Sequence, residues 1–556
     1  MKKKFICALA SACLFLGATS CNKDYLNTFP SSTFDEEQLT NVNTKNGTEG
    51  ILQGIHGMLY QYSFGQWFGN GLHSLNTRID WISDLYVNTR PAYYMGIYRW
   101  DDHVDPYGGM NFSAWDSWYT VIQHCNKVIA KSKPEQYETE GHFKEVLAEA
   151  YLLRAHAMSN LVQYFAPRYN PGGDNSELGI IIRTEPTLDP QARGTVEETY
   201  AQITQDLKTG LDLMGEAAEK KSLIWEKNRI NLPVAYGIAA RALLGKRDYA
   251  GAEKYALLSI QTAEKVGFAR LQKGDELLNG FNSVSAAEWI WGYKYTLDQN
   301  PMFAAWGAHY SYNFGSLKAP TYAINRSYFD KMGMKDVRRR WFIARDYLRD
   351  AAGNPILDAK GKPQLPPIMD IWNDVPEDGS GTLFKELRNG KPDWEYTGQQ
   401  IKFATLEGAG NAVMDAVFMR LGEMYYIAAE AQARQGKLAE ASKTLTKVMI
   451  SRDPQYVVPS GLSADDLAFE VLRNKWIDLY YEGGVFFDQK RIGHVCARLQ
   501  SGNDKYLDPA DLTNFTVRNS GTNAMNIAKD ANSKKWVFAI PYDELKGNKL
   551  CEQNPL

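Results

Sequence analysis

Two stretches of this 556-residue chain carry the same pattern of paired helices, which constrains the fold more than any other feature. In residues 231–261, small and apolar residues recur every three or four positions on both sides of a glycine-containing turn at 245–249. In residues 419–450, the same spacing surrounds a turn at 435–437. Residues at this spacing share one face of a helix, so each stretch predicts a helix, a turn and a second helix.

Paired helices of about 34 residues that stack on their neighbours are typical of tetratricopeptide repeats. Residues 143–165 and 196–214 have the same periodicity and predict two further helices. By contrast, residues 267–410 are rich in Gly, Pro, Asn and aromatic residues and lack long periodic runs. We expect a mostly α fold, in which a tetratricopeptide-repeat-like helical scaffold carries a large irregular loop region and a few short strands.

Two patterns inside the irregular region predict local elements. Trp289 and Trp291 flank Ile290, an alternation that predicts a strand with one buried face. The segments that begin at Asp350 and Asp358 both read Asp-x-x-Gly-x-Pro, which predicts successive turns of a small hairpin. The D-x-D-x-D-G spacing of a calcium loop is absent, so turn chemistry is favoured over a metal site.

The N-terminus has the pattern of a bacterial lipoprotein leader. Lysines at 2–4 precede an apolar run, Phe5 to Gly17, which is too short to span a bilayer and is typical of a cleaved signal peptide. Small residues then lead to Cys21, which is a site for the attachment of acyl chains. Each methylene of such a chain that is buried in the membrane adds roughly 0.8 kcal/mol of membrane affinity. We predict a signal peptide over 1–20 and lipidation at Cys21, with an ordinary secretion signal as the alternative.

The rest of the chain has a small, dispersed negative charge. The net charge of the whole chain is −3, and it becomes −6 when the leader's three lysines are removed. Nucleic-acid binding requires a basic face, so this balance argues against it. Cys125, Cys496 and Cys551 are too widely spaced for a zinc site or a disulfide framework. We expect free, mostly buried thiols, and the sequence leaves a single disulfide open.

The chain is unusually rich in aromatic residues, with 14 Trp, 32 Tyr and 23 Phe. Tyr and Trp combine an apolar ring with a polar group and make good platforms for sugar rings, although most of them belong to the core. The sequence lacks the phosphate-binding, nucleophile-elbow, zinc-protease and dinucleotide-binding motifs. No pair among its 65 acidic residues stands out as a glycosidase pair. We predict a binding protein with no catalytic residue, cofactor or metal.

Six motifs in order, behind this leader, resemble the SusD/RagB family of outer-membrane nutrient-binding lipoproteins. They are the opening Cys21–Pro30, the W-x-x-x-Y helix from Trp115 to Asn126, the A-E-A-x-F-L-R-A-like helix Ala148–Ala155, the repeat Met419–Ala431, the segment Leu479–Arg491, and the closing Ile540–Glu544 with Gln553–Pro555. The fifth departs from the family pattern, because Gly484 or Val485 stands where an arginine is usual and Leu479 and Tyr480 replace an acidic lead.

The resemblance implies a lipoprotein on the outer face of the outer membrane. Such a protein covers a SusC-like TonB-dependent transporter, captures glycans or oligosaccharides, and passes them into the barrel without turnover. Six charged residues of these motifs lie in otherwise apolar helices, where buried charges persist only when they are paired. We therefore expect scaffold ion pairs from Glu149, Arg154, Glu430, Glu482, Asp488 and Arg491.

The resemblance also implies a single SusD-like domain over residues 21–556. Its parts are expected at roughly 115–266 and 418–493 for the helical scaffold, and at roughly 63–111 and 267–412 for the ligand-side loops. A sugar needs rings to stack on and polar groups for its hydroxyls. We predict that the ligand contacts Trp100, Trp306 and Tyr310 as platforms, Tyr312 beside them, and Asp84 and Arg90 as hydroxyl partners. Loop packing is the alternative role for each.

Three other functions stay open on the sequence. The protein could capture peptides, it could be a structural or adhesive helical-repeat lipoprotein without a small ligand, or it could be a glycosidase with a close carboxylate pair. Exposed aromatic side chains that converge on one concavity would favour glycan capture. Aromatic side chains that are all buried would favour the structural role.

Overall fold

The computed structural model describes most of the chain after residue 46. The described residues are 47–61, 71–89, 94–299, 306–312, 322–343, 347–348, 350–352, 354–364, 397–405, 413–494, 496, 498, 501–507, 512–513, 515–516 and 530–555. The helices are α3 (Gly47–Tyr60), α4 (Leu72–Ile79), α5 (Met95–Tyr98), α6 (Gly109–Lys131), α7 (Glu140–Phe165), α8 (Val196–Glu219), α9 (Leu232–Gly245), α10 (Tyr249–Lys265), α11 (Trp306–Tyr310), α12 (Arg326–Phe329), α15 (Leu421–Arg434), α16 (Leu438–Met449), α17 (Ala464–Asp478), α18 (Val485–Ile492) and α20 (Tyr542–Gly547). The strands are β1 (Tyr86–Asn88), β2 (Trp289–Tyr293), β3 (Tyr322–Ile324), β4 (Phe342–Ile343), β5 (Gln399–Gln400) and β6 (Ala416–Arg420).

The predicted helix pairs are confirmed. The first pair is α9 and α10 and the second is α15 and α16, while α7 and α8 are the two further helices. Three of these helices begin at a residue whose side chain caps the helix. The side chains of Thr195, Asn231 and Asp248 accept hydrogen bonds from backbone N–H groups in the first turns of α8, α9 and α10. The fold is mostly α, as predicted.

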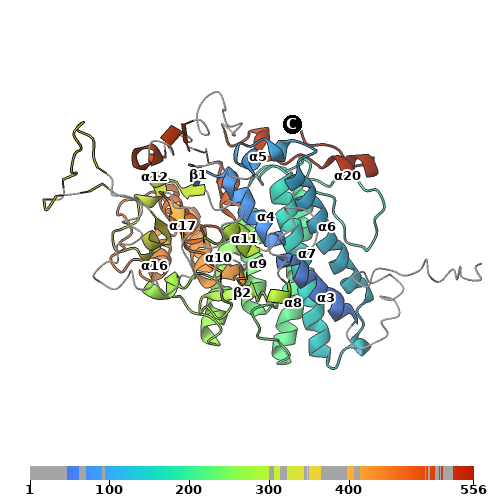
Figure 1. Cartoon of the computed structure of the whole chain (residues 1–556). Helices are drawn as coiled ribbons and strands as arrows, with labels where there is room; N and C mark the ends of the chain where they lie inside the picture. The colour runs from blue at the N-terminus through green and yellow to red at the C-terminus, as the bar shows by residue number, and fades with distance from the viewer. Residues whose placement is uncertain are drawn as a thin grey trace, which may run out of the picture.

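The helices form a layered stack. In Figure 1, α6, α7 and α8 lie side by side at one end, α9 and α10 lie in the middle, and α16 and α17 lie at the other end. One continuous apolar core runs through this stack, from Leu52 in α3 to Cys551 near the C-terminus. A second, strongly aromatic core lies under the irregular loops and includes Trp81, Trp306 and Trp341.

Short antiparallel strand pairs connect the loops to the stack. The pairs are β1 with β3, β2 with β6, and β4 with β5. Strand β2 confirms the predicted strand at Trp289 and Trp291, but the prediction of one buried face was wrong, since all five residues are buried. The reason is that β2 lies between the two cores. Ile290 and Trp291 pack into the helical core, whereas Trp289 packs into the aromatic one.

The predicted hairpin turns are confirmed. Oδ1 of Asp350 accepts the N–H groups of Ala352 and Asn354, and Oδ1 of Asp358 accepts those of Lys360 and Lys362. Both aspartates therefore close their own turns, as short polar side chains commonly do. Within the described ranges, no group of three or more His, Cys, Asp or Glu side chains could hold a metal ion, and no helix is long and apolar enough to cross a membrane.

All three remaining cysteines are free and buried, as predicted. Burial raises the pKa of the Cys125, Cys496 and Cys551 thiols. A thiol with a raised pKa forms little thiolate at neutral pH, so these residues behave as small apolar side chains.

Candidate ligand-binding surface

The charged residues of the sequence motifs form buried ion pairs, as predicted. Arg154 on α7 makes a bidentate contact with Asp206 on α8, at 2.7 Å for Nε and 2.6 Å for Nη2. One turn earlier on α7, Glu149 accepts from Arg229 at 2.5 Å and lies 2.8 Å from His56. These pairs tie α7 to α8, to α3 and to the segment before α9, which is a structural role.

The C-terminal motif forms a second set of pairs. Arg491 on α18 bonds Glu430 on α15 at 2.7 Å and Asp488 at 2.7 Å. The carboxylate of Glu482 accepts from Arg420 at 2.7 Å, and it is also bonded to Lys402. The motif charges are thus neutralised inside the protein and contribute no free charged group to a ligand.

The W-x-x-x-Y helix and the closing I-P-x-x-E motif hold each other in place. Trp115 Nε1 on α6 donates to Glu544 Oε2 on α20 at 3.1 Å. The backbone N–H of Tyr542 donates to the Pro106 carbonyl at 3.0 Å, so α20 is tied to the turn before α6. These bonds bring the end of the chain beside a loop that lies more than 400 residues earlier.

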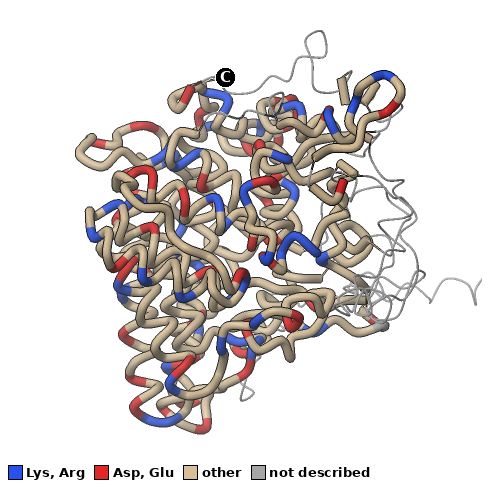
Figure 2. The backbone as a smooth tube through the Cα atoms, turned by 90° about the vertical axis from the view of Figure 1, so that its left-hand side faces the viewer, with Lys and Arg blue, Asp and Glu red and all other residues tan. Residues whose placement is uncertain are grey.

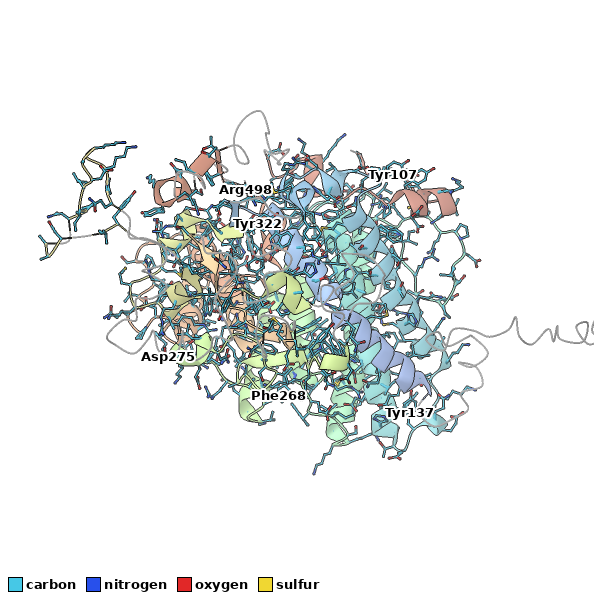
Figure 3. All side chains as sticks on the ribbon, viewed as in Figure 1. Tyr107, Tyr137, Phe268, Asp275, Tyr322 and Arg498 are labelled. Carbon is cyan, nitrogen blue, oxygen red and sulfur yellow. The ribbon has the colours of Figure 1, made fainter. Side chains whose placement is uncertain are left out.

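This junction places two tyrosines on the surface. Tyr107 is 72% exposed and Tyr542 is 43% exposed, and their rings stack with centroids 4.8 Å apart. Figure 3 shows Tyr107 at the upper surface, on the side of the molecule opposite Phe268. Among the described aromatic residues, only Trp225 and Phe469 are also strongly exposed. An exposed stacked pair offers an apolar ring face to a ligand.

A groove lies beside this pair, between α6, α20 and the loop at 178–194. Its volume is about 390 Å³, and it is lined by aromatic rings, acidic side chains, an arginine and amides, including Trp115, Asp116, Tyr119, Gln123, Arg183, Asp543 and Asn548. Loop residue Leu188 also lines it and is 80% exposed. We call these lining residues the α6–α20 groove; Tyr542 directly precedes the lining residue Asp543 in the chain.

The polar groups of the α6–α20 groove suit hydroxyl groups. Burial raises the pKa of the Asp116 carboxyl. Gln123 Oε1 has no hydrogen-bond partner within the described part of the chain. Rings for apolar C–H faces and a few polar groups for orientation are the usual composition of a small-ligand site. Figure 2 shows acidic and basic residues interspersed along the chain in that view.

Comparisons with known families agree with the motifs. A family model described as "Starch-binding associating with outer membrane" matches residues 31–244, and the model described as "SusD family" matches residues 253–556, more than half of the chain. The chain belongs to the SusD family. No curated protein matches it in a sequence search.

Solved structures of SusD-like proteins have the same fold. A SusD-like carbohydrate binding protein from Bacteroides vulgatus ATCC 8482 is 20% identical, with a TM-score of 0.67 over 91% of this chain and 97% of that one. A SusD superfamily protein from Bacteroides thetaiotaomicron VPI-5482 is 19% identical, with a TM-score of 0.62 over 92% and 100%. At these identities the likeness establishes the fold and not the ligand.

The residues predicted as platforms are buried in this SusD-family protein. Trp100 is 0% exposed, donates from Nε1 to the Ile82 carbonyl at 2.9 Å, and packs edge-on against Trp536. Its φ of 64° is in the left-handed region, a strained conformation that costs of order 1–3 kcal/mol and occurs most often at functional sites. Tyr94, at φ 62°, shares this feature and is only partly buried.

Trp306 and Tyr310 lie together on α11. Their ring centroids are 5.2 Å apart, and they are 1% and 0% exposed. Tyr310 Oη donates to the Ser74 carbonyl at 3.0 Å, and Trp306 contacts His73 on the same helix α4. Tyr312 is also buried, in a small cluster next to β4. Their contact with a ligand stays a prediction, and it requires these rings to be uncovered first.

The predicted hydroxyl partner Asp84 takes part in an internal network. Its Oδ1 accepts from Tyr328 at 2.9 Å and Gln489 at 2.6 Å, and its Oδ2 lies 2.9 Å from His494 Nε2. Asp84 is therefore bonded to Tyr328, Gln489 and His494, and Arg90 lies outside the described residues.

Sequence reasoning missed Tyr107 and Tyr542. Tyr107 is within the predicted loop at 63–111, and the surrounding residues Asp105, Pro106 and Gly108 are a turn signal that could have marked it as exposed.

Proposed function

We propose that this protein is a cell-surface lipoprotein that binds glycans or oligosaccharides and delivers them to a SusC-like TonB-dependent transporter, without catalytic turnover. The observation that carries the proposal is the pair of family matches over residues 31–556, the first of which is described as starch-binding and associated with the outer membrane. The carbohydrate-binding name of one fold relative supports the same ligand class.

The leader supports an outer-membrane location with the protein facing outward. Cys21 follows a signal-peptide pattern and lies before the described residues, at the start of a polar segment. Acyl chains at this position would anchor the folded part of the chain to the membrane through a tether.

The surface features support binding more than they support a purely structural role. The exposed Tyr107 and Tyr542 rings stand beside the α6–α20 groove, which is the arrangement that favours glycan capture. The motif charges are held in ion pairs between helices, which supports a scaffold without turnover. We therefore place the ligand first in the α6–α20 groove and, as the alternative position, in the α11 cluster around Trp306 and Tyr310.

The test is calorimetry with a panel of oligosaccharides and oligopeptides on the chain without residues 1–21. The double variant Tyr107→Ala, Tyr542→Ala tests the groove, and Trp306→Ala, Tyr310→Ala tests the α11 cluster. Trp225→Ala is the matched control, because Trp225 is an exposed aromatic residue that packs on Phe268 at the opposite side.

We expect one glycan class to bind, and the groove variant to lose at least tenfold in affinity while Trp225→Ala does not change. Loss only in the folded α11 variant would keep the function and move the site. Binding of peptides alone would replace glycan with peptide capture. If no ligand bound, the proposal of small-ligand capture would be abandoned for the structural role.

A further inference from the structure

A second cavity lies inside the helical stack, away from the α6–α20 groove. It is bounded by residues of α4, α6, α7, α9, α15, α17 and α18, by Phe418 of β6 and by the turn at 482–484, and its volume is about 90 Å³. A water molecule takes up about 30 Å³ of liquid, so the space exceeds a single water. The glycine at 484 adjoins open space, since a Cβ added there would have no neighbour within 4 Å.

Two buried polar groups in the cavity wall have no partner. His73 is 6% exposed and Trp118 is 1% exposed, and within the described residues His73 Nε2 and Trp118 Nε1 make no hydrogen bond. A buried polar group without a partner has lost its hydrogen bonds to water and destabilises the fold. The two groups come from different helices, α4 and α6, and this loss is recovered if a molecule in the cavity bonds to them.

The charges of the cavity wall are already neutralised. Arg241 contacts both oxygens of Glu423, at 2.7 and 2.6 Å, and Lys475 lies 2.8 Å from Asp488. Arg491 and Glu482, which also line the cavity, are paired as described above. A charged ligand would find no counter-charge, so the cavity selects a neutral one.

The imidazoles of the wall are neutral as well. Burial, followed by the nearby Arg241 charge, lowers the pKa of His73 to about 3, and the same two causes lower that of His156 to about 3. A neutral imidazole nitrogen can donate or accept, whereas Trp118 Nε1 only donates. A hydroxyl group, which both donates and accepts, satisfies both sites.

Part of the remaining wall is apolar, and part of it is polar, since three amide side chains and a hydroxyl also line the cavity (Asn76, Asn160, Gln163 and Ser159). Phe418, Phe487, Ile238 and Ile427 line the cavity beside the two unpartnered nitrogens. Water gains little from such surfaces, whereas the C–H groups of a carbon chain pack against them. We propose that this cavity binds one small, neutral polyhydroxy compound, with His73 Nε2 and Trp118 Nε1 bonding its hydroxyls. The site is separate from the surface groove and does not rest on the proposed function.

The experiment titrates the full chain in detergent with glycerol, erythritol and D-glucose, each alone, and follows binding by saturation-transfer NMR. We expect saturable binding of at least one probe at a single site. His73→Phe keeps a ring of similar shape and removes the nitrogen, so it should weaken binding at least tenfold, while His73→Asn retains part of it. Trp118→Phe is the second variant, which serves if His73→Phe does not fold, and Trp225→Ala is the unaffected control.

The three probes separate the sources of the ligand. If glycerol and erythritol bind and glucose does not, the ligand of the cavity is a free short polyol. If glucose binds, the ligand is a sugar residue. If no probe binds saturably, the cavity holds water only and the proposal is overturned. It is equally overturned if folded His73→Phe and Trp118→Phe bind as the original chain does. Oligosaccharide binding at the α6–α20 groove is a separate readout that these two substitutions should not change.

Discussion

At the scale of single residues, the buried ion pairs hold this fold together. Arg154→Met leaves Asp206, which is 1% exposed, without its cation, and removal of one partner of a buried pair costs about 3–5 kcal/mol. We expect a loss of that size in the free energy of unfolding, measured by urea denaturation. Lys208→Ala, on helix α8 with Asp206, removes an exposed pair with Asp212 and should lower the free energy of unfolding far less than Arg154→Met does. Equal losses in both variants would contradict this account.

A second residue-scale prediction concerns acid stability. Burial raises the pKa of Glu149, but the charges of Arg229 and His56 outweigh it and lower the pKa from 4.5 to about 2. In the unfolded chain the Glu149 carboxylate takes up its proton near pH 4.5. The stability that ionised Glu149 gives to the fold is therefore complete above that pH and is lost as the pH falls towards 2. We expect the free energy of unfolding of Glu149→Gln to fall less steeply between pH 5 and 2 than that of the original chain. Parallel pH profiles would argue against it.

At the scale of elements, helix α8 shows how closely the stacked helices approach. A Cβ added at Gly210 would lie 2.7 Å from Leu152 Cγ and 3.2 Å from the Ala148 carbonyl oxygen on α7, whereas one added at Gly215 would meet nothing within 4 Å. Gly215→Ala should therefore stabilise the protein by about 0.5–1 kcal/mol through helix propensity. Gly210→Ala should destabilise it by about 1–3 kcal/mol through overpacking.

Thermal unfolding of these two variants, followed by circular dichroism, checks the sign of each effect. The two positions lie in one helix and receive the same substitution, so helix propensity is matched and packing alone differs. A stabilising Gly210→Ala would mean that α7 and α8 can separate at little cost.

At the scale of the whole molecule, the boundary between the two family matches does not divide the fold. The first match ends at 244 and the second begins at 253, so the gap runs from the last residue of α9 through the first turn of its partner helix α10. The main core also includes residues from both parts. We predict one cooperative unfolding transition, with circular dichroism and tryptophan fluorescence changing together. Two calorimetric transitions would instead indicate two domains.

The helices, the family and the residues that form ion pairs follow from the amino-acid sequence alone. Helix periodicity and capping involve neighbours within a few positions, so the pairs around 245–249 and 435–437 could be read directly. A charge such as Glu149 in an apolar helix must be paired, although its partner Arg229 could not be named. Local chemistry is sufficient for each of these inferences.

Which aromatic residues reach the surface depends on how distant parts of the chain pack together. Trp100 and Trp306 were expected to contact ligand, yet they are covered by Trp536 and by His73, which lie far away in the sequence. Tyr107 stays 72% exposed although α20, from the other end of the chain, packs beside its turn and stacks Tyr542 on it. Burial is a property of non-local contacts, and a local pattern contains no information about which distant segment covers a ring.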